Sequence, residues 1–196
     1  MTHTLLTRRR FGVALAVASL ALVAACGGAS APAASSAGGN TTDHNDADIA
    51  FATDMIPHHA QAVEMADMAL STSKNTEIVA LATSIKGAQE PEIQTMTGFL
   101  RDWKAPIPAT GGGMAGHSSG MSSMMSDSEM ADLGKAMGTA FDTLWLDMMT
   151  RHHEGAIEMS KTELAQGASA DAKTLAQQII AAQTTEIATM KRIKVA

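Results

Sequence analysis

Two histidine pairs flanked by methionines are the side chains of this sequence that are best suited to chemistry. The stretch MIPHHAQAVEM covers residues 55–65, and MTRHHEGAIEM covers residues 149–159. Both follow the pattern Met-x-x-His-His-x5-Met, with a glutamate just before the second methionine. Residues that are three, four or seven positions apart share one face of a helix. Each stretch therefore predicts a helix that presents a histidine between two methionines.

Thioether sulfur combined with imidazole nitrogen is a ligand set that suits Cu(I) and, with more nitrogen, Cu(II). Zinc prefers histidine with cysteine or carboxylate, and calcium needs clustered oxygens. Met148 has no counterpart in the first copy, where Asp54 stands. The two copies therefore predict similar but unequal ligand sets, in two sites or in one shared site. The candidate metal ligands are Met55, His58, His59, Met65, Met148, Met149, His152, His153 and Met159.

Packing is the alternative role for these side chains, because methionine fills irregular cores and a single histidine pair is seldom a metal site. The internal repeat favours a metal. A shift of 94 residues aligns residues 51–96 with 145–190 without a gap, and about a third of the aligned positions are identical. Both histidine pairs persist although the polar residues around them differ, which is difficult to explain by packing alone.

The second part of the repeat has its own pattern, Gln-x-x-Glu-Ile-x-x-Met, at residues 89–96 and 183–190. A glutamate on an apolar helix face needs a partner, because an unpaired buried charge is costly. We expect Glu92 and Glu186 to orient the histidines, from their own hairpin or from the other one, as in carboxylate–histidine–metal arrangements. A solvated glutamate at the end of a bundle is the alternative. The residues that we expect to hold the metal ligands in place are Glu92, Glu186, Gln89 and Gln183.

The hydrophobic period is helical after residue 45, and no alternating run indicates a strand. We expect helices at about 46–70, 75–103, 127–136, 139–166 and 170–194, with Asn75 and Ser126 or Asp127 as N-caps and Gly167 as a C-cap. The repeat unit is thus a helical hairpin, which cannot bury both of its apolar faces alone. Hairpins 46–103 and 127–196 predict an all-α four-helix bundle domain over residues 46–196.

The linker at residues 104–126 is rich in Met, Gly and Ser. Packing does not account for methionines in a segment of this composition, so we interpret them as auxiliary copper ligands. A methionine-rich linker without a metal role is the alternative. The auxiliary candidates are Met114, His117, Met121, Met124 and Met125.

Residues 1–26 have the features of a bacterial lipoprotein signal. Arginines at 8–10 precede the apolar run 11–25, which ends in small residues before Cys26. The run is shorter than the roughly 20 residues that span a bilayer, although an uncleaved anchor or a twin-arginine signal would also fit. We expect export, with lipidated Cys26 attaching the protein to the outer side of the cytoplasmic membrane and 27–45 as a flexible tether.

Charge and cysteine content exclude several classes of protein. Cys26 is the only cysteine, so no internal disulfide and no cysteine-based metal site can form. Without residues 1–26 the chain has 11 basic and 20 acidic residues, a net charge of −9 with histidine neutral. This acidic balance argues against nucleic acid as a partner and mildly favours cations.

Signatures of enzymes are mostly missing. No Glu-x-x-His motif occurs, and His153-Glu154 is not followed by a histidine at position 157, so neither a di-iron carboxylate site nor a zincin motif is encoded. Coordination of metal without turnover is therefore the predicted role. An exported metal-dependent enzyme and a metal-free helical interaction module are the alternatives.

Three motifs resemble those of the CopM-like family, which is also catalogued as domain of unknown function number 305. They are FATDMIPHHAQAVEMADMAL, FDTLWLDMMTRHHEGAIEMSKTEL and the two Q-x-x-E-I-x-x-M segments, and the resemblance covers residues 46–194. It implies a ferritin-like four-helix bundle, usually exported, with copper binding and copper tolerance. The expected function is to sequester or relay copper ions, with copper-handling proteins as partners.

Overall fold

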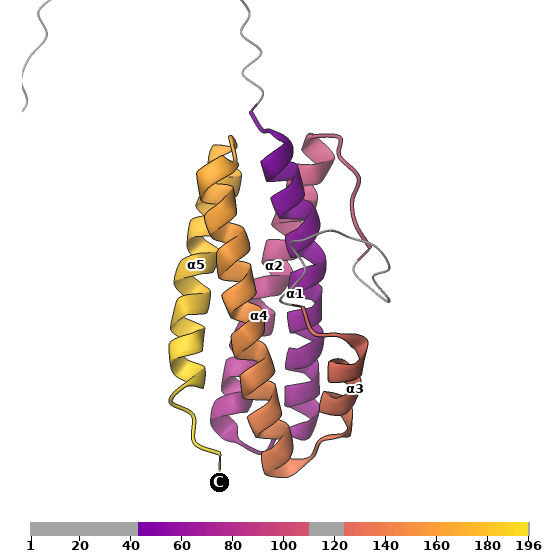
Figure 1. Ribbon diagram of the computed structural model, residues 1–196, viewed down its shortest axis with the longest axis vertical. Coiled ribbons are helices and arrows are strands. Elements are labelled where there is room, and N and C mark those ends of the chain that lie inside the picture. The colour runs from indigo at the N-terminus through magenta and orange to yellow at the C-terminus, as the bar shows by residue number, and fades with distance from the viewer. Residues whose placement is uncertain (1–42, 110–123, 196) are drawn as a thin grey trace, which may run out of the picture. The chain divides into compact units, whose positions relative to one another are not determined.

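Four long helices and one short helix make up the described part of the protein (Figure 1). The computed structural model describes residues 43–109 and 124–195. Its helices are α1 (Asp46–Thr72), α2 (Thr76–Asp102), α3 (Asp127–Lys135), α4 (Gly138–Gln166) and α5 (Ala170–Met190). None of the described residues is in a strand. The prediction of an all-α four-helix bundle is confirmed.

The two halves of the repeat fold as hairpins, α1 with α2 and α4 with α5. Short connections at residues 73–75 and 167–169 join the helices of each hairpin. α1 packs against α4, so the two helices with histidine pairs face each other. α2 and α5 also lie side by side, but they make fewer contacts, and α3 lies against α4.

Side-chain caps begin most of the helices. Asn45 accepts hydrogen bonds from two backbone N–H groups at the start of α1, and the predicted cap Asn75 does the same for α2. Ser126 caps α3. Helix α4 has no side-chain cap and begins at Gly138, whose φ of +57° is a left-handed conformation that glycine adopts at little cost.

Helix α5 ends at Met190, four residues before the predicted end. The chain then turns so that Ile193 is buried in the core. The side chain of Asn75 also donates a hydrogen bond to the carbonyl oxygen of Lys194 at 3.1 Å. These tertiary contacts replace the last turn of helix that the periodic pattern predicted.

Two hydrophobic clusters fill the bundle on either side of its middle. The Trp145 cluster includes Met65, Leu81, Ile85, Leu133, Phe141, Trp145, Met148 and Met149, and the Phe51 cluster includes Phe51, Met55, Ile56, Met96, Leu100 and Ile179. Each fully buried large apolar side chain stabilises the fold by about 1.5–3 kcal/mol. The indole N–H of Trp145 donates to the carbonyl oxygen of Met65 at 2.8 Å, which ties α4 to α1 inside the first cluster.

Two buried aspartates connect the hairpins, and they occupy equivalent positions in the repeat. Asp48 at the start of α1 accepts hydrogen bonds from the backbone N–H groups of Ala168 and Ser169, in the connection between α4 and α5. Asp142 near the start of α4 accepts one from the hydroxyl of Ser73, in the connection between α1 and α2, at 2.6 Å. In these cross-hairpin contacts the first helix of each hairpin therefore binds the turn of the other hairpin.

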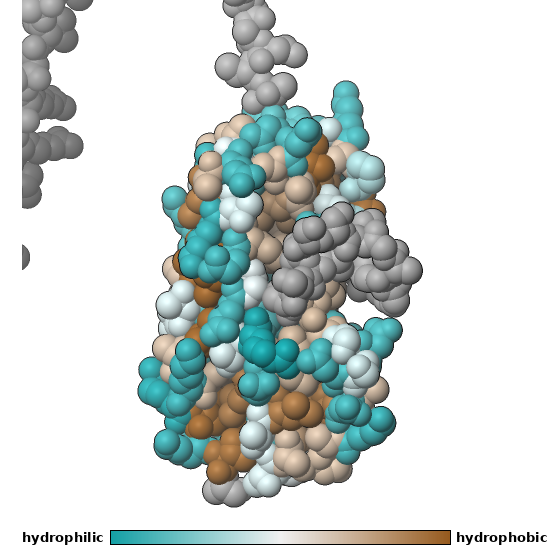
Figure 2. Space-filling view, viewed as in Figure 1, coloured by the Kyte–Doolittle hydropathy of each residue, from teal (hydrophilic) through white to brown (hydrophobic). Residues whose placement is uncertain are grey.

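In the view of Figure 2 hydrophilic side chains cover much of the bundle, and the most hydrophobic ones gather toward its lower end. The exposed large hydrophobic residues among those described are Leu70, Ile107 and Met137. Across residues 43–109 and 124–195, every helix is too short or too polar to cross a bilayer. The predicted signal and Cys26, most of the tether, and Met114, His117 and Met121 lie outside the described residues.

Candidate metal centre

The four histidines of the two pairs meet in the middle of the bundle, between the two hydrophobic clusters. His58 and His152 lie ring against ring, with centroids 3.7 Å apart and an interplanar angle of 36°. Each of the four residues is at most 1% exposed. We call His58, His59, His152 and His153 the histidine layer. Because His58 and His152 are equivalent in the repeat, the pseudo-two-fold axis of the bundle passes between their rings.

Burial keeps the imidazoles of His58 and His152 neutral. The pKa of His58 lies well below its usual value of 6.5, first because burial penalises the charged form and then because His59 and His153 are close. The pKa of His152 is lowered in the same way, by burial and then by the other three histidines. At neutral pH a metal ion therefore does not have to displace a proton from these two rings.

The other two histidines each pair with a glutamate of their own hairpin. His59 Nε2 lies 2.7 Å from Glu92 Oε2, and His153 Nε2 lies 2.8 Å from Glu186 Oε2. A carboxylate can only accept, so in both pairs the Nε2–H group is the donor. The Nδ1 atoms of His59 and His153 are buried and have no hydrogen-bond partner. In neutral rings these atoms present lone pairs, as in a carboxylate–histidine–metal arrangement.

Two glutamines add unpaired polar atoms to the same level of the bundle. Gln89 and Gln183 precede the glutamates by one helical turn and are at most 3% exposed. Both amide atoms of Gln89 and Oε1 of Gln183 have no hydrogen-bond partner. Leaving a buried polar group unsatisfied costs about 1–3 kcal/mol. A bound ligand or ordered water would relieve this cost.

The methionines of the two motifs fall on opposite sides of the histidine layer. Met65 belongs to the Trp145 cluster together with Met148 and Met149, whereas Met55 belongs to the Phe51 cluster, against which Met159 packs. Ten residues of helix span roughly 15 Å, so the two methionines of one motif cannot bind the same ion. Because α1 and α4 are antiparallel, Met65 instead lies with Met149 in the Trp145 cluster, and Met159 lies with Met55 at the Phe51 cluster.

The sequence of the chain matches the family described as Domain of unknown function (DUF305) over residues 48–194. The chain belongs to the DUF305 family. No curated protein matches the chain.

Solved structures of DUF305 proteins share this fold. A protein from Streptomyces coelicolor, described as a secreted DUF305 protein, is 33% identical with a TM-score of 0.66, over 74% of this chain and 88% of that one. CopM in a Cu(II)-bound form is 34% identical with a TM-score of 0.64, over 74% and 93% of the two chains. CopM in a Cu(I)-bound form is 31% identical with a TM-score of 0.62, over the same shares.

The donor atoms present in this DUF305 domain fit a soft metal better than a hard one. In the part of the chain that the structure describes, no three His, Cys, Asp or Glu side chains form a ready-made coordination group. Besides the imidazoles, the same level of the bundle has the amides of Gln89 and Gln183, and the methionines of the motifs lie on either side of it. Imidazole and thioether together, without thiolate, suit copper.

The linker methionines that are described differ in burial. Met124 is half-buried, and Met125 is 4% exposed within the Trp145 cluster. The backbone of Met125 also exchanges two hydrogen bonds with the side chain of Gln61, both at 2.8 Å. Core packing therefore accounts for Met125, which the composition of the linker did not predict. A metal role for the auxiliary methionines stays a prediction.

Proposed function

We propose that this protein binds copper ions at the histidine layer and sequesters or relays them outside the cytoplasm. The observation that supports this most directly is the pair of buried, unpaired Nδ1 atoms on His59 and His153, each on a ring oriented by a glutamate. A purely structural polar layer would gain stability by satisfying these atoms. The copper-bound forms of CopM support copper as the metal.

The proposed ligands are the imidazoles of the histidine layer together with the nearest thioethers. Met55 lies one helical turn before His59, and Met149 lies one turn before His153, and both methionines are fully buried. Met148 adds a third buried thioether on the side of α4, where α1 has Asp54. Imidazoles serve both oxidation states of copper, whereas the thioethers favour Cu(I).

Export and lipid attachment are part of the same proposal. They are supported by the lipoprotein-like features of residues 1–26 and Cys26, and by the relative in Streptomyces coelicolor that is described as secreted. A helical domain of residues 46–196 on a tether would then present the histidine layer outside the membrane, where copper tolerance and exchange with copper-handling proteins are its proposed roles.

An anaerobic titration of residues 27–196 with Cu(I) against a competing chelator tests the copper site. Changing all four histidines to alanine should abolish competition, with circular dichroism to verify the fold. Because that variant alters a buried layer, Met55→Leu with Met149→Leu is the milder test, since leucine conserves the volume. Met96→Leu with Met190→Leu is the matched control, because these buried methionines lie on α2 and α5, outside the two histidine motifs. If the histidine variant and both methionine double variants bound Cu(I) with the affinity of the parent protein, the site would be refuted.

A further inference from the structure

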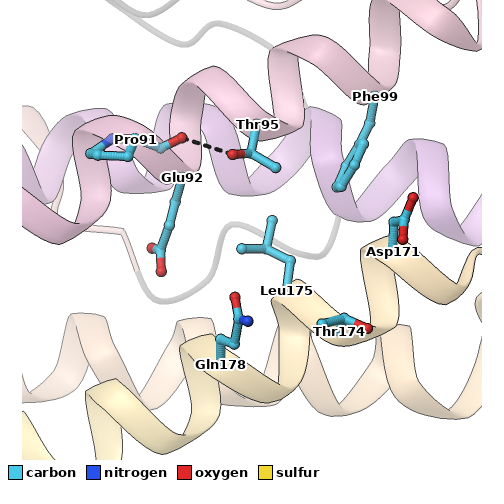
Figure 3. Close-up of a pocket in the computed structure, with 8 residues that line it drawn as sticks. All are labelled: Pro91, Glu92, Thr95, Phe99, Asp171, Thr174, Leu175 and Gln178. Carbon is cyan, nitrogen blue, oxygen red and sulfur yellow. Dashed lines mark hydrogen bonds between the residues drawn. The ribbon is translucent and has the colours of Figure 1, made fainter. Parts of the chain in front are cut away.

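A groove of about 420 Å³ lies between α2 and α5, the pair of helices that touch loosely. Its lining residues are Pro91, Glu92, Thr95 and Phe99 from α2 and Asp171, Thr174, Leu175 and Gln178 from α5. Figure 3 shows the side chains of Glu92 and Gln178 projecting from the two helices into the space between them. The groove is open to solvent, so it is a surface feature and not an internal cavity.

Glu92 connects this groove with the histidine layer. The same carboxylate that lines the groove accepts the hydrogen bond from His59 Nε2 at 2.7 Å. The side chain of Glu92 is 18% exposed, and that of His59 is 0% exposed. Glu92 therefore contacts both the buried imidazole of His59 and the groove.

The charge of the groove suits a cation. Its two ionisable residues, Glu92 and Asp171, are both acidic, and no basic side chain is among the lining residues. Phe99 and Leu175 provide apolar walls beside them. Carboxylates next to low-dielectric walls concentrate cations and raise their association rates.

The opposite side of the α2–α5 contact differs, although the repeat makes it formally equivalent. Glu186 takes the place of Glu92 there, and its side chain is 13% exposed. The counterpart of Phe99 is Ile193, which is buried in the Trp145 cluster by the turn after α5. Phe99 itself is only half-buried. The turn at the end of α5 thus makes the two sides unequal.

We propose that copper ions reach and leave the histidine layer through the α2–α5 groove, passing Glu92. This inference rests on the proposed copper site and adds the path. Asp171 and Glu92 attract the ion, and displacement of the Glu92 carboxylate from His59 opens the floor of the groove. Glu92 is thus a positioning and gating residue, while Glu186 orients His153 without lying on the path.

The repeat provides a matched pair of variants for the test. Thr95→Trp places a large side chain in the groove, and Thr189→Trp places the same side chain at the equivalent position on the other side. Stopped-flow transfer of Cu(I) from a chromogenic chelator to residues 27–196 gives the rate, and equilibrium competition gives the affinity. We expect Thr95→Trp to slow transfer about tenfold at unchanged affinity, and Thr189→Trp to leave the rate unchanged.

A second pair tests the charge of the groove without altering the histidine layer. Asp171→Asn should slow Cu(I) transfer about threefold at low ionic strength and have no effect at high salt, because salt screens exposed charges. Glu77→Gln, at the equivalent position of α2, should have no effect at either salt concentration. If the two variants of each pair took up Cu(I) at the same rate and bound it with the affinity of the parent protein, the path would be refuted but the copper site would not. A parent protein that binds no Cu(I) would overturn the proposed function as well.

Discussion

Asp48 and Asp142 are equivalent residues of the repeat, but different groups satisfy them at the two ends of the bundle. Asp142 accepts the hydroxyl hydrogen of Ser73. At the other end the equivalent of Ser73 is Gly167, and a Cβ atom there would collide with the carboxyl group of Glu163 and lie 2.8 Å from Asp48 Oδ1. The carboxyl of Glu163 therefore occupies the space that the serine side chain fills at the first end.

A proton on Glu163 makes this arrangement favourable. Burial, followed by the interaction with Asp48, raises the pKa of Glu163 to about 8 from an ordinary 4.5, while the charge of Lys173 from α5 acts in the opposite direction. Burial alone would raise the pKa of Asp48, but hydrogen bonds from Ala168, Glu163 and other groups bring it below its usual value. The protonated carboxyl of Glu163 can donate to the Asp48 carboxylate as Ser73 does to Asp142.

The first prediction concerns pH. The folded protein retains a proton on Glu163 that the unfolded chain loses near pH 4.5, so the stabilisation is complete below that pH and is lost as the pH rises through about 8. Glu163→Gln keeps a donor that does not titrate. We expect parent and variant to have similar melting temperatures near pH 5, and the parent to melt lower than the variant near pH 9.

Thermal unfolding followed by circular dichroism in matched buffers measures this difference. Glu158→Gln is the control, because Glu158 is exposed on the same helix and should leave the pH profile of the parent unchanged. A gap between parent and Glu163→Gln that stays constant from pH 5 to 9 would show that Glu163 does not titrate in this range.

The second prediction changes Gly167 and Glu163 to the residues that stand at the equivalent positions of the other end of the bundle. Gly167→Ser alone should destabilise the protein by about 1–3 kcal/mol, because its Cβ overlaps Glu163. Adding Glu163→Ala recreates the combination of Ala69 and Ser73 at the opposite end, where the serine hydroxyl donates to the aspartate. The double variant should therefore recover much of the loss. Urea unfolding of the parent, both single variants and the double variant gives the coupling energy, and additive effects would contradict this account.

The third prediction concerns Ser73. Ser73→Ala removes the hydroxyl that donates to the buried Asp142, and hydrogen bonds to charged groups contribute about 1.5–3 kcal/mol. We expect the free energy of unfolding to fall by a similar amount in urea titrations. Ser71→Ala is the control, because Ser71 is exposed and its hydroxyl donates to the backbone carbonyl oxygen of Met68 and lies 3.5 Å from the hydroxyl of Thr72. If both variants lose equal stability, the contact with Asp142 is not responsible.

The fourth prediction concerns the orientation of the histidines. Glu186→Gln weakens the hydrogen bond that holds His153, and residues in this position around a metal typically change its affinity by about 10–100-fold. We expect a drop of this size in Cu(I) affinity by chelator competition, with little change in melting temperature. Glu154→Gln, on the exposed face of α4 next to His153, should leave the affinity unchanged.

Features that depend only on residues close together along the chain were predictable from the sequence. The helical period, the cap at Asn75 and the gap-free repeat predicted the bundle and its two hairpins, because each is a local rule applied to one segment. The end of α5 was predicted too late, since burial of Ile193 depends on a distant connection. The role of Gly167 as a C-cap is confirmed, but its contact with Glu163 was not foreseeable.

For the histidine layer, too, the sequence predicted local spacing but not the contacts between helices. Spacing placed Met55, His58 and Met65 on one stripe, but only the antiparallel packing of α1 against α4 shows that the two methionines lie in different clusters. The ring contact of His58 with His152 and the pairing of His59 and His153 with glutamates of their own hairpins are tertiary contacts. The groove depends on a pair of helices that touch loosely, a property that no periodic pattern encodes.

The cross-hairpin contacts of Asp48 and Asp142 have a consequence for how the two hairpins assemble. Since the first helix of each hairpin binds the turn of the other, a lone hairpin could make both contacts by associating with a second copy of itself. Two such hairpins would be related by the axis that passes between the rings of His58 and His152. Within one chain the two ends need not be identical: one has Glu163 and Gly167, and the other has Ala69 and Ser73.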